Sequence, residues 1–169
     1  MTVNGAHVRE AMPWLWDLYH HEFLDLAKQA SGHDVFCATR DQIKVNLNVQ
    51  VGRNMRYECH VDSNPLEGLL YLTTHPPGAG GELVVANHKG ATSVEAVDAD
   101  CTVIHPLAGN LVFFDARHHP HYVRSLRDDD SVRIVAAMNY YTEECDESKR
   151  PIDLDQHLFG ESKEEATGA

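Results

Sequence analysis

The stretch that decides the fold is Tyr57-Glu58-Cys59-His60-Val61-Asp62, which ends a short strand-like segment and runs into a turn. In an extended strand the side chains of residues i and i+2 project from the same face, so His60 and Asp62 can bind one ion together. One further histidine would complete a facial triad of two histidines and one carboxylate, which holds non-haem Fe(II) and leaves coordination positions open. The spacing therefore predicts a metal centre. The motif is short, so it leaves open the alternative that His60 and Asp62 are simply two polar residues on an exposed strand.

Candidates for the second histidine lie further along the chain, in His118-His119-Pro120-His121-Tyr122-Val123. His121 is favoured because it opens an alternating segment after an apolar run. Pro120 biases His119 to an extended conformation without aiming its side chain. His118 is the third candidate, and the remaining histidines are interpreted as surface residues or caps.

Short strands are predicted on both sides of this motif. The segment 43–51 alternates apolar and polar residues with a period of two, which is typical of a half-buried strand. Its polar face carries amides, which either meet solvent or line a wet cavity. Further strands are predicted over residues 55–62, 68–74, 82–87, 93–97, 102–104, 111–115, 122–126 and 132–141. Repeated short strands with Gly- and Pro-rich turns predict a mainly β protein, a sandwich or barrel of which the double-sheet jelly roll is one form.

The two ends of the chain differ from this β pattern. Residues 7–30 carry apolar residues near a period of 3.6, which predicts one amino-terminal helix that packs its Trp/Leu face on a sheet. The residues near that period are Trp14, Leu15, Leu18, Glu22 and Leu26, and Phe23 broadens the apolar stripe. From residue 143 the sequence is polar, and we expect disorder after Gly160. The expected organisation is a single domain over 1–169, with the helix at 7–30, a β core over 35–142 and a polar tail over 143–169.

The composition limits the class of partner. A chain of 169 residues suggests one domain, and its net charge of −12 argues against nucleic acid, whose binding depends on Lys and Arg. The sequence shows no signal-peptide pattern and no apolar stretch long enough to span a membrane. Its four cysteines are far apart and form no CxxC pair, which disfavours zinc and suggests reduced thiols. We expect a cytoplasmic protein, a monomer or homodimer, that acts on a small molecule.

Arg133 enters the apolar segment Ile134-Val135-Ala136-Ala137-Met138. A buried charge is costly unless it meets a charge of opposite sign, so this position needs an anion. An ion pair with one of the acidic residues at 128–130 is one interpretation. The other is a ligand carboxylate held through two hydrogen bonds, a geometry that suits arginine better than lysine.

The motifs taken in order resemble the 2-oxoglutarate/Fe(II)-dependent dioxygenase superfamily, above all its prolyl-4-hydroxylase-like branch, which includes the oxygen-sensing prolyl hydroxylases. The resemblance covers about residues 45–142. It rests on Tyr57-x-x-His60-Val61-Asp62-Ser63-Asn64-Pro65, Leu70-Tyr71-Leu72, Gly80-Gly81-Glu82-Leu83, Gly109-Asn110-Leu111-Val112-Phe113-Phe114, Pro120-His121-Tyr122-Val123 and Arg133.

The resemblance implies a double-stranded β-helix (jelly-roll) core and Fe(II) bound by His60, Asp62 and His121. It implies 2-oxoglutarate as cosubstrate, O2 as oxidant and ascorbate as a candidate reductant. Arg133 would hold the distal carboxylate of 2-oxoglutarate, Tyr71 would hydrogen-bond this cosubstrate and Tyr57 would line the pocket. The sequence departs from the family in a longer gap between His121 and Arg133. A second departure is Gln50, which stands where the oxygen-sensing enzymes have another tyrosine.

These expectations predict an enzyme that hydroxylates an unactivated C–H bond of a small molecule, either an amino acid or a natural-product intermediate. Hydroxylation of a prolyl residue in a peptide or protein is the alternative that the family suggests. A cupin-like metalloprotein that does not use 2-oxoglutarate is the alternative from another class, although cupins usually present HxH where this chain has His60-x-Asp62. The polar residues that we consider for substrate recognition are Asn46, Asn48, Gln50, Arg117 and Asn139.

Overall fold

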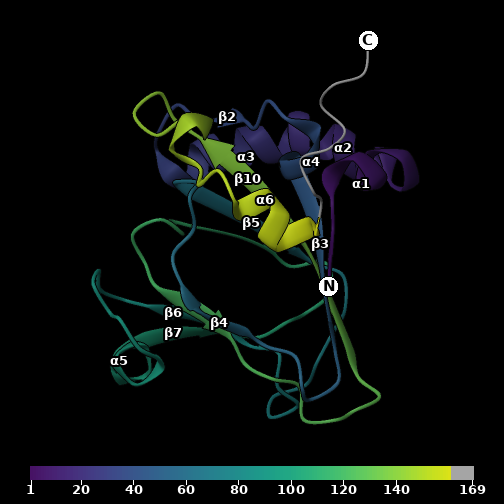
Figure 1. Ribbon diagram of the computed structural model, residues 1–169, viewed down its shortest axis with the longest axis vertical. Coiled ribbons are helices and arrows are strands. Elements are labelled where there is room, and N and C mark those ends of the chain that lie inside the picture. Colours follow the sequence, from purple (N-terminus) through teal and green to yellow (C-terminus); the bar gives the residue numbers. More distant parts are fainter. Residues whose placement is uncertain (161–169) are drawn as a thin grey trace.

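Two antiparallel sheets face each other and form the body of the protein (Figure 1). The structure is a computed structural model that describes residues 1–160. The larger sheet contains β1 (Thr2–Val3), β2 (Phe36–Cys37), β3 (Val45–Val51), β5 (Leu66–Tyr71), β8 (Leu111–Phe114) and β10 (Val132–Tyr141). The smaller sheet contains β4 (Tyr57–His60), β6 (Leu83–Ala86), β7 (Cys101–Ile104) and β9 (His121–Val123). This arrangement confirms the prediction of a mainly β, jelly-roll protein.

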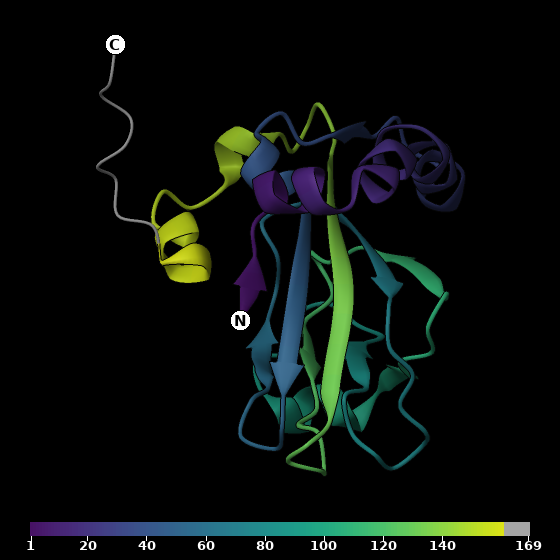
Figure 2. The same ribbon diagram turned by 90° about the vertical axis from the view of Figure 1, so that its right-hand side faces the viewer.

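Strands that are distant in the sequence lie side by side in both sheets. The larger sheet has the order β1-β3-β10-β5-β8, with β2 also pairing with β10, and the smaller sheet has the order β4-β9-β6-β7. The long strand β10 pairs antiparallel with both β3 and β5 and occupies the centre of the larger sheet (Figure 2). The pairing of β4 with β9 brings the two histidine-containing segments together.

The central strand β10 separates two layers of the core. Ala136, Met138 and Tyr140 pack against the helices, whereas Val135 and Ala137 pack toward the smaller sheet. This division follows from the alternation of side chains along a strand. The inner face of the larger sheet therefore meets the smaller sheet, and the space between them holds the site described below.

Helices cover the outer face of the larger sheet (Figures 1 and 2). They are α1 (Gly5–Ala11), α2 (Pro13–His20), α3 (Glu22–Ser31) and the short α4 (Asp41–Lys44). The prediction of one helix over residues 7–30 is wrong, because the backbone leaves the helical region at Met12 (φ −135°, ψ 60°) and at His21 (φ −123°, ψ −93°). Pro13 lacks a backbone N–H and so begins a new helix instead of continuing the first.

The predicted apolar face of these helices is correct at Leu15 but wrong at Trp14 and Leu26. Leu15 and Tyr19 are fully buried, whereas Trp14 is 50% exposed and Leu26 is 44% exposed. The break at His21 interrupts the helical period, so the residues of α2 and α3 do not share one continuous stripe. The face that packs on the sheet is set by the i, i+4 pair Leu15 and Tyr19.

Tyr19 fastens the helical layer to β10. Its hydroxyl donates to the carbonyl oxygen of Asn139 at 2.7 Å and accepts from the backbone N–H of Ala38 at 2.8 Å. Its ring lies 5.0 Å from the ring of Tyr140. Each satisfied buried hydrogen bond of this kind stabilises a fold by about 0.5–1.5 kcal/mol. The helices thus hold the backbone of Asn139, whose side chain faces the opposite side of the sheet.

Two further segments correct the predictions. Residues 93–97, predicted as a strand, form the start of helix α5 (Val94–Ala99), because the Ser93 hydroxyl caps the helix by accepting from the N–H of Ala96. Ile43, predicted as the first residue of a strand, lies in α4.

The polar tail also contains ordered structure, namely the 3-10 helix η1 (Glu147–Lys149) and the helix α6 (Leu154–Phe159). The disorder predicted after Gly160 lies outside the described residues. Within residues 1–160, each helix is too short or too polar to cross a bilayer.

The loop over residues 75–81 packs tightly against the segment that follows β9. The N–H of Gly81 donates to the carbonyl of Arg124, and the N–H of Arg127 donates to the carbonyl of Ala79. Gly80 has a positive φ of 85°, and a Cβ at this position would lie 2.0 Å from the carbonyl oxygen of Ser125. Gly78 has a similar φ of 87°, but a Cβ there would meet nothing within 4 Å.

We predict that Gly80→Ala is far more destabilising than Gly78→Ala. Both variants bear the cost of a left-handed backbone, about 1–2 kcal/mol, but only Gly80→Ala forces a side chain into the backbone of Ser125. The free energy of unfolding, measured by urea denaturation, should fall by about 2 kcal/mol more in Gly80→Ala than in Gly78→Ala. Equal urea midpoints for the two variants would show that this loop does not dock as described.

Candidate metal centre

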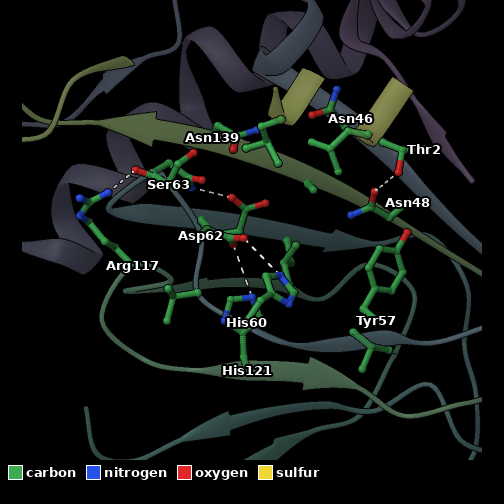
Figure 3. Close-up of a pocket in the computed structure, with 18 of the residues that line it drawn as sticks. Thr2, Asn46, Asn48, Tyr57, His60, Asp62, Ser63, Arg117, His121 and Asn139 are labelled. Carbon is green, nitrogen blue, oxygen red and sulfur yellow. Dashed lines mark hydrogen bonds and ion pairs between the residues drawn. The ribbon is translucent and has the colours of Figure 1, made fainter. Parts of the chain in front are cut away.

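His60 and His121 face each other across two neighbouring strands. His60 ends β4, His121 begins β9, and the two residues are direct partners in the antiparallel register. Their ring centroids are 4.4 Å apart. Asp62 follows β4 and turns its carboxylate toward both rings, with Oδ1 at 3.3 Å from His60 Nε2 and Oδ2 at 3.5 Å from His121 Nε2 (Figure 3). The backbone N–H of Asp62 donates to the carbonyl of Ala116, which holds this residue at the rim of the sheet.

One ligand atom from each of these three residues lies within 4.8 Å of the others, so one ion can contact all three. The backbone orients both imidazole rings: His60 Nδ1 lies 2.6 Å from the carbonyl oxygen of Glu58, and His121 Nδ1 lies 3.0 Å from that of His119. A carbonyl only accepts, so each Nδ1 carries a proton, and each Nε2 would present a lone pair to a bound metal ion once it has lost its own proton. This is the tautomer that binds a metal, and such backbone contacts are the usual support of metal-binding histidines.

The pKa values of Asp62 and His60 are both shifted within this cluster. Burial acts to raise the pKa of Asp62, but hydrogen bonds from His121 and His60 outweigh it and hold this pKa well below its ordinary value. Burial acts to lower the pKa of His60, but the hydrogen bond and charge of Asp62 outweigh it and raise this pKa. The cluster therefore favours an ionised carboxylate with a positive charge beside it, a role that a metal cation fills when it displaces protons.

The two other candidate histidines lie elsewhere. His118 Nδ1 lies 3.0 Å from the carboxylate of Asp115, and His119 Nδ1 lies 2.8 Å from the carbonyl oxygen of Ala86. Neither belongs to the three-residue cluster. Of the three alternatives that the sequence leaves open, the structure brings His121 to the pair His60 and Asp62.

A cavity of about 1080 Å³ opens between the two sheets at this cluster. The ring of Phe114 meets that of His121 edge to face, with centroids 4.9 Å apart. Apolar side chains from both sheets form much of the wall: Leu69, Leu83, Phe114, Val123, Val135 and Ala137. Apolar walls with a few polar groups are typical of small-molecule sites.

Arg133 reaches the same cavity from the larger sheet. It is only 1% exposed, and its Nε has no hydrogen-bond partner among residues 1–160. No carboxylate in this part of the chain forms an ion pair with it, and Asp129 pairs with Arg53 instead at 2.8 Å. Burial lowers the pKa of Arg133, and the nearby Tyr71 partly opposes that shift. A buried guanidinium with no anion of its own thus lines the cavity.

Three further residues named from the sequence surround Arg133 or the cavity. The ring centre of Tyr71 lies 5.4 Å from the guanidinium carbon of Arg133, and its hydroxyl has no partner within residues 1–160. Tyr57 lines the cavity. Gln50 is opposite Arg133 in the register of β3 and β10, and its Nε2 donates to the carbonyls of Met55 and Arg124.

Sequence reasoning missed Glu67. This residue is 6% exposed and lines the cavity, and its Oε2 accepts from Asn64 Nδ2 at 2.7 Å. Burial, and then the negative charge of Asp62, raise the pKa of Glu67 well above its ordinary value. The signal was present in the sequence, because an acid within the apolar run 66–70 poses the same problem as an arginine at position 133.

The polar tail was also missed as part of the site. Pro151, Leu154 and Leu158, from the segment that includes α6, line the cavity. Helix α6 lies beside β1 at the edge of the larger sheet (Figure 2). The tail therefore supplies part of the wall near the amino terminus of the chain.

Residues 45–141, more than half of the chain, match the family model described as the 2OG-Fe(II) oxygenase superfamily. No curated protein matches the sequence. The matched segment contains His60, Asp62, His121 and Arg133.

Several solved structures share the fold. The non-haem α-ketoglutarate-dependent epimerase SnoN from nogalamycin biosynthesis has a TM-score of 0.63 at 16% identity, over 83% of this chain and 62% of that one. A prolyl 4-hydroxylase from Phytophthora capsici has a TM-score of 0.63 at 18% identity, over 90% of this chain and 50% of that one. AviO1 from Streptomyces viridochromogenes Tue57 has a TM-score of 0.63 at 17% identity, over 85% of this chain and 67% of that one. The chain thus spans between half and two-thirds of the length of these proteins, and the likeness is one of fold.

We predict that the protein binds one divalent ion per chain and that His60→Ala or Asp62→Ala weakens the binding by about 100-fold or more. Titration with Co(II), followed by its visible absorption, measures this directly. His118→Ala is the matched control, because it removes a neighbouring imidazole that is not part of the cluster. Binding that is unchanged in His60→Ala, or lost in His118→Ala, would contradict this assignment of ligands.

Proposed function

The chain belongs to the 2OG-Fe(II) oxygenase superfamily, and on this premise we propose that it is an Fe(II)- and 2-oxoglutarate-dependent dioxygenase that hydroxylates an unactivated C–H bond of a small molecule. The observation that carries the proposal is the buried, unpaired Arg133 in the same cavity as the cluster of His60, Asp62 and His121. A metal-binding cluster alone is compatible with many reactions. A cation set apart from it in the same cavity points to a cosubstrate with an anionic end.

The donor set fits ferrous iron. Two imidazole nitrogens and one carboxylate oxygen, all on one side of the ion, are the facial triad of non-haem Fe(II) oxygenases. In this proposal His60, Asp62 and His121 hold the metal, and the carbonyls of Glu58 and His119 keep the imidazoles oriented. When bound, Fe(II) and 2-oxoglutarate supply the activation of O2 and the oxidation of the substrate C–H bond.

The cavity also fits a dicarboxylate. Arg133 would bind the distal carboxylate of 2-oxoglutarate with its planar guanidinium, and the Tyr71 hydroxyl beside it would add a hydrogen bond. Leu69, Val135 and Ala137 give the wall an apolar character between Arg133 and the metal cluster. A diacid of five carbons has the same pattern, with polar ends and an apolar middle.

The size of the cavity supports a small-molecule substrate. Sites for drug-sized ligands occupy roughly 300–1,000 Å³, so about 1080 Å³ can hold the cosubstrate together with a second small molecule. Leu154 and Leu158 of the tail segment add apolar side chains to the lining of this space. Among proteins of this fold, SnoN is an epimerase of nogalamycin biosynthesis and another is a prolyl 4-hydroxylase, so the fold by itself does not choose between the two substrate classes.

We predict that the protein converts 2-oxoglutarate to succinate in a reaction that depends on Fe(II) and O2, and that Arg133→Met raises the KM for 2-oxoglutarate by about tenfold or more. Because methionine removes an unpaired buried charge, the urea midpoint of the free protein should stay the same or rise. Arg53→Met, which removes an exposed arginine outside the cavity, is the control and should leave the KM unchanged.

The two readouts separate function from folding. A higher KM with an undiminished urea midpoint supports a direct role of Arg133 in cosubstrate binding. Turnover that is indifferent both to 2-oxoglutarate and to Arg133→Met would defeat the proposed function and favour a metalloenzyme of another class.

A further inference from the structure

A second buried ionisable side chain lies on the inner face of the larger sheet. Glu67 on β5 is the register partner of Asn139 on β10 and of Phe114 on β8. Direct partners in antiparallel strands have Cβ atoms about 4.5–5.5 Å apart and share one face of the sheet. Since Phe114 touches the ring of His121, this row of residues lies at the level of the metal cluster. Glu67 and Asn139 both line the cavity.

Two asparagine side chains on this face, Asn139 in the Glu67 row and Asn46 in the next row, present acceptors. Asn139 Nδ2 donates to the carbonyl of Ile43 at 2.6 Å, and Asn46 Nδ2 donates to the carbonyl of Gln42 at 2.7 Å. A backbone carbonyl only accepts, so the atom of each side-chain amide that faces the carbonyl must be the nitrogen. The Oδ1 atom of each asparagine therefore points away from that carbonyl. Neither Oδ1 accepts a hydrogen bond from residues 1–160, and both side chains line the cavity on the side of β3 and β10 (Figure 3).

Glu67 adds a carboxyl group to these two oxygens. Its Oε2 is held by Asn64 Nδ2, and no hydrogen bond within residues 1–160 reaches Oε1. The cation whose charge acts on Glu67 is Arg150, but the guanidinium of Arg150 is already bound to Asp155 at 2.9 Å and lies 3.4 Å from the Ser63 hydroxyl. No ion pair to Glu67 forms within this part of the chain. The carboxyl group thus has one oxygen fixed and one oxygen available.

The ligand group that complements such a cluster is an ammonium. It carries three N–H donors and no acceptor, so it can donate to Glu67 Oε1 and to Asn139 Oδ1 of the same row, with Asn46 Oδ1 on the next row of the same face. It also supplies the positive charge that would favour the ionised form of the buried Glu67. A hydroxyl group would add a further acceptor and no charge, and a carboxylate would be repelled by Glu67 and Asp62.

The position of this cluster separates it from the cosubstrate. Arg133 lies six residues before Asn139 on β10, so the two residues belong to opposite ends of one face of that strand. A cosubstrate that extends from the metal toward Arg133 therefore leaves the surroundings of Glu67 for the substrate.

We propose that Glu67, with Asn139 and Asn46, forms the subsite that binds an ammonium group of the substrate, and that the substrate is accordingly a small primary amine or a free amino acid. This rests on the proposed function, because it takes the cavity at the metal cluster as the active site. Glu67 determines specificity by fixing the charged nitrogen, while the metal ligands and Arg133 serve the reaction and the cosubstrate.

The test uses the whole protein loaded with Zn(II), which occupies the metal site without turnover. A panel of the common L-amino acids and their decarboxylated amines, each paired with its N-acetyl derivative, is screened by saturation-transfer NMR with and without 2-oxoglutarate. We expect some ammonium compounds to bind and their N-acetyl partners not to bind. In Glu67→Gln the affinity for those ammonium compounds should fall by about tenfold or more, while Zn(II) and 2-oxoglutarate still bind.

Glu82→Gln is the matched control, because Glu82 is also buried, at 4% exposure, but does not line the cavity. It should bind the panel as the wild type does. The proposal is overturned if N-acetyl derivatives bind as well as the free amines, if no ammonium compound binds, or if Glu67→Gln binds amines normally. The comparison of free amines with their N-acetyl derivatives uses the wild-type protein, so it does not depend on whether a variant folds. A failure of the wild-type protein to bind 2-oxoglutarate would be a separate result, and it would count against the proposed function and not against the ammonium subsite.

Discussion

The pairing of β4 with β9 is the constraint on which the rest of the site depends. His60 and His121 come from distant parts of the chain and meet only because these strands are neighbours in this register. Successive side chains of a strand alternate between faces, so a slip by one residue would turn one histidine away from the other. β9 is held on its other edge by β6, where His121 is opposite Val85. The metal centre is thus a consequence of how the smaller sheet is assembled.

The larger sheet has two faces with different roles. Its outer face carries Ala136, Met138 and Tyr140 against the helices and contributes apolar burial. Its inner face carries Arg133 and Glu67, which are buried and have no ion pair of their own within residues 1–160. Buried unpaired charges oppose folding, and proteins keep such groups where function needs them. The stable outer layer offsets the cost of a polar inner face that is prepared for charged ligands.

Much of the fold and of the candidate site could be predicted from the sequence because the responsible signals are local. The period of two in residues 45–51 and the spacing His60-x-Asp62 depend only on strand geometry. Arg133 was found because a charge inside an apolar strand is costly wherever that strand lies. The same argument applies to Glu67, because an acidic residue inside the apolar segment 66–70 is equally costly to bury.

Other features depend on contacts that the sequence does not display. A short apolar segment such as 93–97 fits a strand or a helix, and here the cap from Ser93 decides for the helix. The break at Met12 has a signal in Pro13, whereas the break at His21 could not be placed because the apolar residues around it tolerate a continuous helix. The part of the tail in the cavity wall was hidden by its polar composition, since Leu154 and Leu158 gain their role only by packing at the site.

The central claim is that His60, Asp62 and His121 bind one ferrous ion in a cavity that also contains Arg133. Anomalous diffraction at the iron edge, from crystals grown without oxygen in the presence of Fe(II) and 2-oxoglutarate, tests it most directly. The account predicts one iron peak in contact with both Nε2 atoms and the Asp62 carboxylate, with the far carboxylate of 2-oxoglutarate on Arg133. An iron peak elsewhere, or a dicarboxylate that extends away from Arg133, would contradict it.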